Sequence, residues 1–345
     1  MIAILTGGTG FIGKNLVSSL IARGYKVRCL VRSTSRVEAL ISLGVELHYG
    51  DLSDLRTLKE ITKGGDVVYH LAAVVSDWGS KEEFYRVNVE GTENLLKASV
   101  ENGVKRFVFL SASSVLWSYN LWKIHDLDNV HESYPYPASY KDLYNETKAE
   151  AEKIVSEYFN KTGLETVILR SSAVWGPGDT VILPRVVRAA KKGILIFVGK
   201  GDKWVTPCYV ENLVEALILA GEKENVAGNI YFINDGIKID NRHFISLLLK
   251  TVGIDWSPGI SIPYSFAYVL ASMIELVYKI VRSNKPPFLT KFAVASLAGS
   301  RTYSIEKAKR QLGYHPNINL EEGLRRLEEW VKSIGGIEGF LGVQR

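Results

Sequence analysis

A glycine-rich stretch close to the start of the chain constrains its fold more than any other feature. Residues 2–5 form a short apolar run, and residues 6–13 then have the sequence Thr-Gly-Gly-Thr-Gly-Phe-Ile-Gly. A strand, a tight glycine turn and a helix N-terminus in this order are typical of a dinucleotide site, because the backbone approaches a pyrophosphate closely and the helix N–H groups face its charge. The pattern predicts that Gly7, Gly10, Phe11, Ile12 and Gly13 bind the cofactor.

Strand-like and helix-like segments alternate up to about residue 180. The strand-like runs are rich in Val, Ile and Leu with little alternation, as in strands that are covered on both faces. Expected strands are 2–5, 26–30, 45–49, 67–70, 106–110 and 166–170, and expected helices are 13–22, 55–61, 81–102 and 139–162. This order predicts an α/β fold with a doubly wound parallel sheet of the Rossmann type.

The strict alternation weakens after the Gly-Pro-Gly-Asp sequence at 176–179, where helical patterns at 182–192, 211–222 and 242–253 follow. We expect residues 1–180 to form a dinucleotide-binding domain and residues 181–345 a smaller, mostly helical substrate-binding lobe. Doubly wound sheets bind ligands at the carboxyl ends of their strands, so a second lobe there would close over the reacting atoms.

The composition argues against several other classes of protein. The 42 Lys and Arg residues exceed the 37 Asp and Glu residues by only five and are spread along the chain, whereas a nucleic-acid binder usually concentrates its basic residues. Cys29 and Cys208 lie far apart in apolar stretches, which argues against a disulfide framework and favours a cytoplasmic location. We expect a small-molecule substrate, no nucleic-acid partner and no metal site.

The end of the second expected strand bears on which dinucleotide binds. A carboxylate there would bind the ribose hydroxyls of NAD, but this strand is followed by Arg32. A guanidinium can meet a 2′-phosphate with two parallel hydrogen bonds, so the sequence predicts NADP as the cofactor, with Arg32 at the phosphate. The alternative is an arginine that is merely exposed on a loop, in which case NAD remains open.

Further cofactor contacts are expected where the third and fourth strands end. Asp51 and Leu52 would lie at the adenine, and Leu71, Ala72 and Ala73 would bring small side chains beside the cofactor.

Tyr144 and Lys148 are four residues apart in an expected helix and therefore share one of its faces. Free tyrosine titrates near ~10, and a fixed cation nearby favours the phenolate. Such a tyrosine could exchange a proton with an alcohol or a carbonyl as a hydride moves. The same spacing is common on solvated helix faces, so the value of the pair depends on its surroundings.

Together with the glycine turn, these features resemble the extended short-chain dehydrogenase/reductase family, over residues 1–332. Other matching segments are 51–52, 70–73, 88–92, Arg170 and 174–179. The resemblance implies that Tyr144 is the catalytic acid/base, and that Lys148 lowers its pKa and holds the nicotinamide ribose. It also implies that Asn88 supports the site, with a purely structural role between helix and sheet as an equal alternative.

One position departs from that family. A serine or threonine usually lies three residues before the valine that matches Val115, and this chain has Ala112 there. Ser111, Ser113 and Ser114 flank it. We predict that Ser113 supplies the missing hydroxyl, because it lies beyond the strand end whereas Ser111 can still point into the sheet.

The C-terminal segments are similar to the 3β-hydroxysteroid dehydrogenase branch of the family, through residues 263–267, 286–290 and 303–316. Nucleotide-sugar epimerases share the last of these segments. The apolar run 260–281 contains Glu275 and Lys279, whose spacing predicts an ion pair on a surface or interfacial helix and argues against a membrane span.

We therefore expect an NADP-preferring oxidoreductase that interconverts a secondary alcohol and a ketone on a bulky apolar, steroid-like substrate. The run 260–281 would form an apolar wall, or an edge that rests on a membrane. The alternative is a nucleotide-sugar epimerase, dehydratase or reductase that holds a diphosphate through Arg185, Arg188 and Lys191. A non-catalytic NADP sensor is a third class, against which Tyr144 and Lys148 argue. The resemblance also implies a homodimer.

Overall fold

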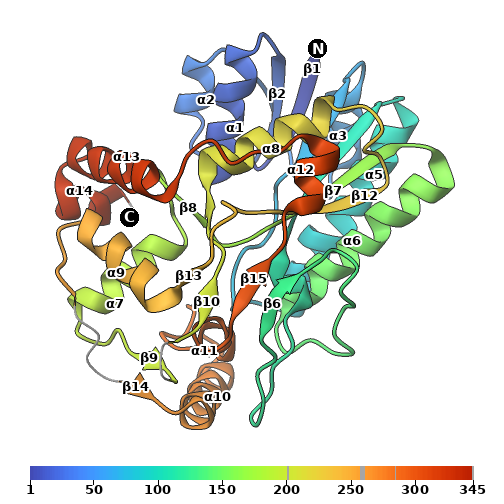
Figure 1. Cartoon of the computed structure of the whole chain (residues 1–345). Coiled ribbons are helices and arrows are strands. Elements are labelled where there is room, and N and C mark those ends of the chain that lie inside the picture. Colours follow the sequence, from blue (N-terminus) through green and yellow to red (C-terminus); the bar gives the residue numbers. More distant parts are fainter. Residues whose placement is uncertain (200–201, 257–260, 284, 344–345) are drawn as a thin grey trace.

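The structure, a computed structural model, describes residues 1–199, 202–256, 261–283 and 285–343. Its centre is a seven-stranded sheet with the order β12-β7-β5-β4-β1-β2-β3, and every pair in it is parallel (Figure 1). The strands are β1 (Ile2–Thr6), β2 (Lys26–Val31), β3 (Glu46–Tyr49), β4 (Val67–His70), β5 (Arg106–Ala112), β7 (Glu165–Ser171) and β12 (Asn229–Ile233). The predicted doubly wound parallel sheet is confirmed.

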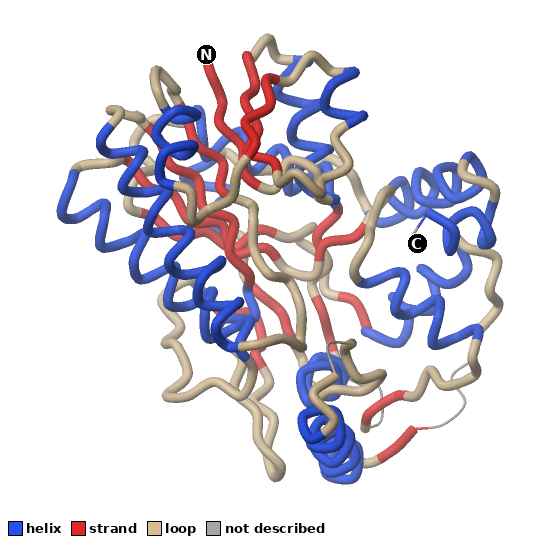
Figure 2. Tube along the Cα trace, turned by 180° about the vertical axis from the view of Figure 1, so that it is seen from behind, coloured by secondary structure: helices blue, strands red, loops and turns tan. Residues whose placement is uncertain are grey.

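Helices cover both faces of this sheet, because alternate residues of its strands are apolar on both sides. In β1, Ala3 and Leu5 enter one buried cluster and Ile4 enters the other. The helices on the first face are α1 (Phe11–Ala22), α8 (Val210–Glu222) and α12 (Glu306–Leu312), and those on the second are α3 (Leu55–Thr62), α5 (Gly91–Glu101) and α6 (Leu143–Thr162). The tube view in Figure 2 shows the sheet between these helical layers.

The chain returns to the large sheet after residue 181. Strand β12 (Asn229–Ile233) pairs with β7, and α8 packs on the sheet, although both come after residue 180, where the sequence predicts the second lobe. The five-residue strand β12 lies between helices in the sequence, as the short strands expected within the second lobe do. The local pattern therefore could not show whether β12 belongs to that lobe or to the large sheet. The expected division at residue 180 is therefore corrected for these two elements.

The second lobe is mostly helical. It contains α7 (Ile182–Lys191), α9 (Asn241–Thr251), α10 (Tyr264–Ile280), α11 (Lys291–Ala298), α13 (Leu320–Ser333) and α14 (Gly336–Val343). A small sheet with the order β13-β10-β15-β6 joins β13 (Ile239–Asp240), β10 (Trp204–Val205), β15 (Arg301–Tyr303) and β6 (Leu127–Val130). Because β6 comes from the first half of the chain, both halves contribute to this sheet.

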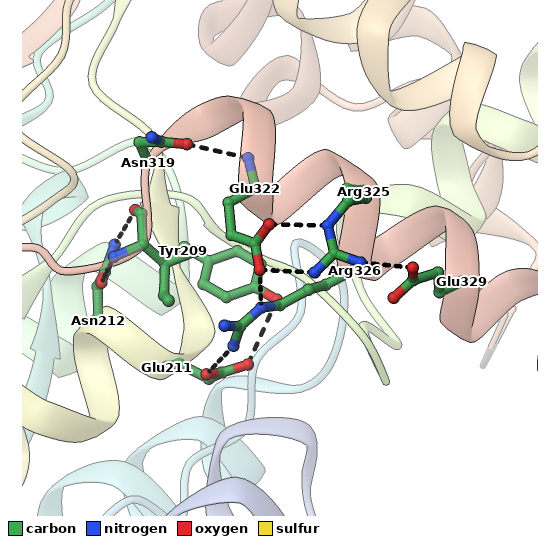
Figure 3. Close-up of polar contacts among 9 residues, drawn as sticks. Tyr209, Glu211, Asn212, Asn319, Glu322, Arg325, Arg326 and Glu329 are labelled. Atoms are coloured by element: carbon green, nitrogen blue, oxygen red, sulfur yellow. Dashed lines mark hydrogen bonds and ion pairs between the residues drawn. The ribbon is translucent and has the colours of Figure 1, made fainter.

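Polar contacts attach α13 to α8 and so join the two parts of the molecule (Figure 3). The Arg326 guanidinium lies 2.6 Å from the Glu211 carboxylate. The side chain of Asn212 donates to the backbone carbonyl of Ile318 at 2.8 Å and accepts from its N–H at 3.0 Å. Asn319 then caps the start of α13. These contacts fix the second lobe on a helix that packs against the sheet.

Candidate active site

The carboxyl ends of the central strands bring the predicted cofactor residues to one edge of the sheet. Thr6 at the end of β1 pairs with His70 at the end of β4, and His70 pairs with Phe109 near the end of β5. The glycine turn, residues 71–73 and the β5 end therefore follow three adjacent strands.

The glycine turn is packed so closely that side chains would not fit. Gly7 has φ +77°, and a Cβ there would lie 2.8 Å from the backbone N of Ala72. A Cβ on Gly13 would lie 2.1 Å from the carbonyl oxygen of Gly7. Gly10 is exposed and precedes α1, whose N-terminus receives no side-chain cap from it. The first-turn N–H groups thus face an open approach, which fits a pyrophosphate.

Gly178, in the matching segment 174–179, lies close to Phe11 at the end of this turn. A Cβ on Gly178 would lie 3.5 Å from the Phe11 ring, so the glycine allows the two segments to approach closely. Asp179 accepts the N–H groups of three residues at the start of α7. Ile12, by contrast, is half-buried and packs on the core between α1 and the sheet.

The predicted adenosine contacts lie at the ends of β2 and β3. Arg32 is exposed, and its guanidinium forms no ion pair or hydrogen bond to the residues that the structure describes. Asp51 accepts the N–H of Ser53 at 2.7 Å, and hydrogen bonds from Ser53 hold the pKa of its carboxyl below the usual value. Leu52 is buried against Gly91, where a Cβ would come within 2.7 Å of it. Arg32 is thus available for an anionic ligand, whereas Leu52 also serves helix packing.

A buried hydrogen-bond chain that the sequence analysis did not predict joins this edge to α6. The N–H of Ala72 donates to the Thr6 hydroxyl at 3.2 Å, and that hydroxyl lies 2.6 Å from His70 Nδ1. His70 Nε2 lies 2.9 Å from the Thr92 hydroxyl, which donates to the carbonyl of Asn88. The Thr92 hydroxyl donates its proton to the Asn88 carbonyl, so it can only accept a hydrogen bond from His70. The His70 ring therefore carries its proton on Nε2.

Asn88 continues this chain to the helix that carries the predicted catalytic pair. Its side chain accepts the N–H of Val74 at 2.7 Å and donates to the Thr147 hydroxyl at 3.0 Å. The expected helix over 81–102 is divided into α4 (Lys81–Phe84), a π-helical segment η1 (Tyr85–Glu90) that contains Asn88, and α5. Asn88 therefore links the loop after β4 to α6, and both of its predicted alternatives, support of the site and a structural tie, stay open.

Lys148 is buried at the carboxyl end of β5. Its Nζ donates to the Leu110 carbonyl at 2.7 Å and lies 4.0 Å from the centre of the Phe109 ring. Burial lowers the pKa of Lys148 to about 7, with the charge of Glu152 acting in the opposite direction. The ammonium is thus fixed beside the strand end that leads to residues 111–116.

Tyr144 lies one helical turn earlier, in the first turn of α6, and its hydroxyl has no hydrogen-bond partner in the described part of the chain. Burial raises the pKa of Tyr144, and the charge of Asp142 adds to this. The charge that acts on the Tyr144 phenol is that of Asp142 and not that of Lys148, so the lowering of its pKa by Lys148 that the resemblance implies stays a prediction. A protonated phenol at this place can donate a proton.

The three serines around Ala112 differ in their surroundings. Ser113 is buried, and its hydroxyl is hydrogen-bonded to the Tyr303 phenol, a partner from β15 that sequence order could not reveal. The buried Ser111 hydroxyl has no partner among the described residues. Ser114 is buried in the short helix η2 (Ser113–Leu116). The predicted role of Ser113 thus competes with a contact within the protein.

Two of the three basic residues expected to hold a diphosphate are paired with carboxylates. Arg185 lies 2.9 Å from Asp77, and Lys191 lies 2.7 Å from Glu338. Arg188 is exposed. This arrangement weakens the nucleotide-sugar alternative, because a diphosphate would have to replace existing ion pairs.

Most of the apolar run 260–281 forms α10, which follows the short strand β14 (Ser261–Ile262), and Ile260 lies outside the described residues. The predicted pair between Glu275 and Lys279 is wrong: Glu275 is buried and lies 3.1 Å from Lys291 of α11. Packing of α10 on α11 turns this carboxylate inward, and Lys279 stays exposed. No helix in the described ranges is long and apolar enough to cross a bilayer.

Comparison with known proteins agrees with this arrangement. A family model described as the 3-beta hydroxysteroid dehydrogenase/isomerase family matches residues 4–264. The chain is 36% identical over 330 residues to a 4-hydroxy-2-methyl-3-oxo-4-farnesyl-3,4-dihydroquinoline-1-oxide ketoreductase of Stigmatella aurantiaca, with 95% of this chain and 96% of that protein covered. It is 35% identical over 346 residues to 3beta-hydroxysteroid-dehydrogenase/decarboxylase isoform 1 of Arabidopsis thaliana, with 94% and 78% covered.

A solved structure extends the similarity to the whole fold. The UDP-glucose 4-epimerase of Thermotoga maritima, crystallised with UDP-glucose, has a TM-score of 0.76 and 25% identity to this chain. The match covers 96% of this chain and 99% of the epimerase.

Proposed function

The chain belongs to the 3-beta hydroxysteroid dehydrogenase/isomerase family, and we propose that within it the protein interconverts a ketone and a secondary alcohol on a bulky apolar substrate, with NADP as the preferred cofactor. Membership makes the chain an extended short-chain dehydrogenase/reductase, that is, an oxidoreductase that uses a NAD(P) cofactor. The observation that carries the proposal is the pair of Tyr144 and Lys148 on α6, held beside the β5 end next to the glycine turn.

The glycine turn and Arg32 support the cofactor part of the proposal. The open N-terminus of α1 suits the pyrophosphate, and the Arg32 guanidinium, which has no partner among the residues described, suits a 2′-phosphate. When bound, the nicotinamide would supply or accept the hydride. Asp51, Leu52 and residues 71–73 would complete the contacts at the strand ends.

Proton transfer is assigned to Tyr144. Its raised pKa keeps the phenol protonated at neutral pH, so in ketone reduction it would donate the proton to the carbonyl oxygen as the carbonyl carbon is reduced. Lys148 would hold the ribose and stabilise the phenolate that remains. Ser113 stays the predicted donor to the substrate oxygen, provided that its hydroxyl exchanges Tyr303 for the substrate.

An apolar surface on α10 supports the substrate class. Tyr268, Val269, Met273 and Leu276 of α10, together with Ser272 and Leu121, line an open hollow of about 250 Å³. A lipophilic molecule gains roughly 25 cal/mol for each square ångström of apolar surface that it buries, whereas a sugar nucleotide gains little from such a wall. The name of the Stigmatella relative contains a farnesylated ketone, and that of the Arabidopsis relative contains a hydroxysteroid. Both names support the same substrate class.

A substrate panel tests this proposal. NADPH oxidation is followed with isoprenoid and steroid-like ketones and with UDP-sugars, for the parent protein and for a Val269→Ser/Met273→Ser variant. We expect turnover of lipophilic ketones, with KM raised roughly tenfold in the variant because apolar contact is lost. Turnover confined to UDP-sugars and unchanged in the variant would overturn the proposal in favour of the nucleotide-sugar alternative.

A further inference from the structure

A buried arginine of β15 has hydrogen-bond donors that no described residue satisfies. Arg301 is only 4% exposed, and its Nη1 donates to the backbone carbonyls of His125 and Ser300 at 2.7 and 2.8 Å. Its Nε and Nη2 are buried and have no hydrogen-bond partner in the part of the chain that the structure describes. Burying the donors of an ionised group without an acceptor is costly, so these two nitrogens favour an acceptor from outside the chain.

The two unpartnered nitrogens form the edge of the guanidinium that is suited to a carboxylate. Nε and Nη2 of an arginine point in the same direction and match the two oxygens of that group. Arg170 uses this edge on Glu152, at 3.1 and 2.7 Å. Arg106 uses it on Glu165, at 3.0 and 2.6 Å. Arg301 therefore presents the same edge with which Arg106 and Arg170 hold carboxylates.

The carboxylate of Asp126 lies near Arg301 but is held by other groups. It lies 2.8 Å from Lys203 and accepts the N–H of Ser300 at 2.7 Å. Burial lowers the pKa of Arg301, and the Tyr303 phenol and Asp126 act in the opposite direction. An arginine stays protonated at neutral pH in any case. The charge of Arg301 is therefore available to an anionic ligand.

Arg301 is linked to the candidate active site through one aromatic ring. Its guanidinium carbon lies 4.8 Å from the centre of the Trp117 ring. Tyr303, two residues along β15 and so on the same face of the strand, accepts from Trp117 Nε1 at 2.8 Å. The Tyr303 phenol is also hydrogen-bonded to Ser113, the predicted donor to the substrate oxygen. A bulky substrate whose carbonyl lies at Ser113 would therefore extend toward Arg301.

The apolar hollow on α10 also lies close to Arg301. Tyr264, at the start of α10, is near enough for its phenol to act on the pKa of Arg301. The ring centres of Tyr264 and Tyr268 are 5.8 Å apart, and Tyr268 lines the hollow. Figure 1 shows β15 beside β6, above α10 and α11. A carbonyl at the site, an acid group at Arg301 and an apolar chain along the hollow therefore fit one molecule.

We propose that Arg301 binds a carboxylate of the substrate, so that the molecule reduced is an apolar oxo acid and not a neutral ketone. Nε and Nη2 would donate to the two carboxylate oxygens. Arg301 would select the substrate and take no part in the transfer of the proton or the hydride. Since it would bind the molecule whose carbonyl Tyr144 protonates, this inference rests on the proposed function.

Paired substrates test the proposal. NADPH oxidation is followed with long-chain oxo acids that differ in the spacing of the two groups, and with the methyl ester of each acid. We expect the parent protein to favour the acid of at least one pair by roughly 10–100-fold in kcat/KM, as a charge-assisted bidentate contact would give. Arg301→Met should raise KM for that acid by a similar factor and leave its kcat and the ester nearly unchanged.

Two control variants separate recognition of the acid from an effect on folding. Arg301→Lys keeps the charge but not the fork, so it should retain part of the acid preference. Arg56→Met changes an exposed arginine that pairs with Glu60, and it should leave the ratio of acid to ester unchanged. If Arg301 only supported the fold, Arg301→Met would slow the acid and the ester together, and the unchanged ratio would contradict the proposal.

A binding measurement tests the same contact without turnover. The protein is titrated, in the presence of NADP, with decanoate and with decanol, which share an apolar chain and have no ketone. We expect the parent to bind decanoate roughly tenfold more tightly than decanol, and Arg301→Met to bind both about equally.

The two measurements distinguish this inference from the proposed function. Equal binding of decanoate and decanol by the parent, or an acid preference that survives in Arg301→Met, would overturn the role of Arg301. Reduction of lipophilic ketones without any acid preference would also overturn it and leave the proposed function intact. Binding of decanoate that depends on Arg301, with no reduction of any ketone, would instead refute the proposed function and keep the carboxylate site.

Discussion

The pKa of Lys148 shows how burial changes the ionisation of a single residue in the site. Its pKa of about 7 in the folded chain lies below its ordinary value of 10.5, so between these values the unfolded chain binds a proton that the folded chain does not. The free energy of unfolding should therefore rise with pH across this window, by about 1 kcal/mol per pH unit, and the destabilising effect of burial should be fully present below pH ~7.

Urea unfolding at a series of pH values checks this expectation. Lys148→Met removes the titrating group and keeps the volume, so the difference between parent and variant should change steadily from pH 7 to pH 10. Parallel stability curves for the two proteins would contradict the prediction.

Arg32 is a second single residue with a testable role, since it is the residue proposed to make the protein prefer NADP over NAD. Replacing it by Asp in Arg32→Asp removes a charge-assisted contact to the 2′-phosphate, worth about 1–3 kcal/mol, so NADP affinity should fall roughly 5–150-fold and NAD affinity should change little. Fluorescence titration with both nucleotides measures this. Arg56→Asp, at an exposed arginine that pairs with Glu60, is the matched control. Equal affinities for NADP and NAD in the parent protein would refute the preference.

At the scale of elements, a buried ion pair joins α6 to β7. Arg170 lies 2.7 Å from Glu152, both side chains are at most 1% exposed, and the Tyr136 hydroxyl donates to the same carboxylate at 2.6 Å. Arg170→Met should lower the free energy of unfolding by about 3–5 kcal/mol, because it leaves a buried carboxylate without its partner.

Chemical denaturation of single and double variants measures this cost. Glu152→Leu/Arg170→Met should recover much of the stability, since no buried charge then remains. Lys161→Met, which breaks the exposed pair with Glu157 on the same helix, should cost less than about 0.5 kcal/mol. Similar costs for Arg170→Met and Lys161→Met would contradict the account.

At the scale of elements, the sequence predicted the strands and helices that local residue patterns determine. The six expected strands agree with the structure to within two residues, because continuous apolar runs and glycine turns are local signals. Contacts between distant segments were not predictable in this way. The pairing of Glu275 with Lys291, the hydrogen bond of Ser113 to Tyr303 and the seventh strand β12 all depend on tertiary packing.

For the molecule as a whole, the two parts of the chain are joined on both sides of the candidate site. On one side α13 is fixed to α8, and on the other Asp77, in the loop after β4, binds Arg185 of α7 and the Thr290 hydroxyl at the start of α11. These contacts therefore connect the part that carries the dinucleotide turn and the Tyr144–Lys148 pair with the part that carries the apolar α10, as the proposed function would require.

The central claim is that Tyr144 transfers the proton while the rest of this arrangement holds the cofactor. Its most direct test compares the parent protein with Tyr144→Phe, using NADPH deuterated at C4 and a lipophilic ketone that the parent reduces, and follows both deuterium transfer and NADPH affinity. The account predicts that Tyr144→Phe lowers kcat by about 10²–10⁴-fold and leaves the Kd of NADPH within about threefold of the parent. Deuterium transfer by Tyr144→Phe at close to the parent rate would contradict it.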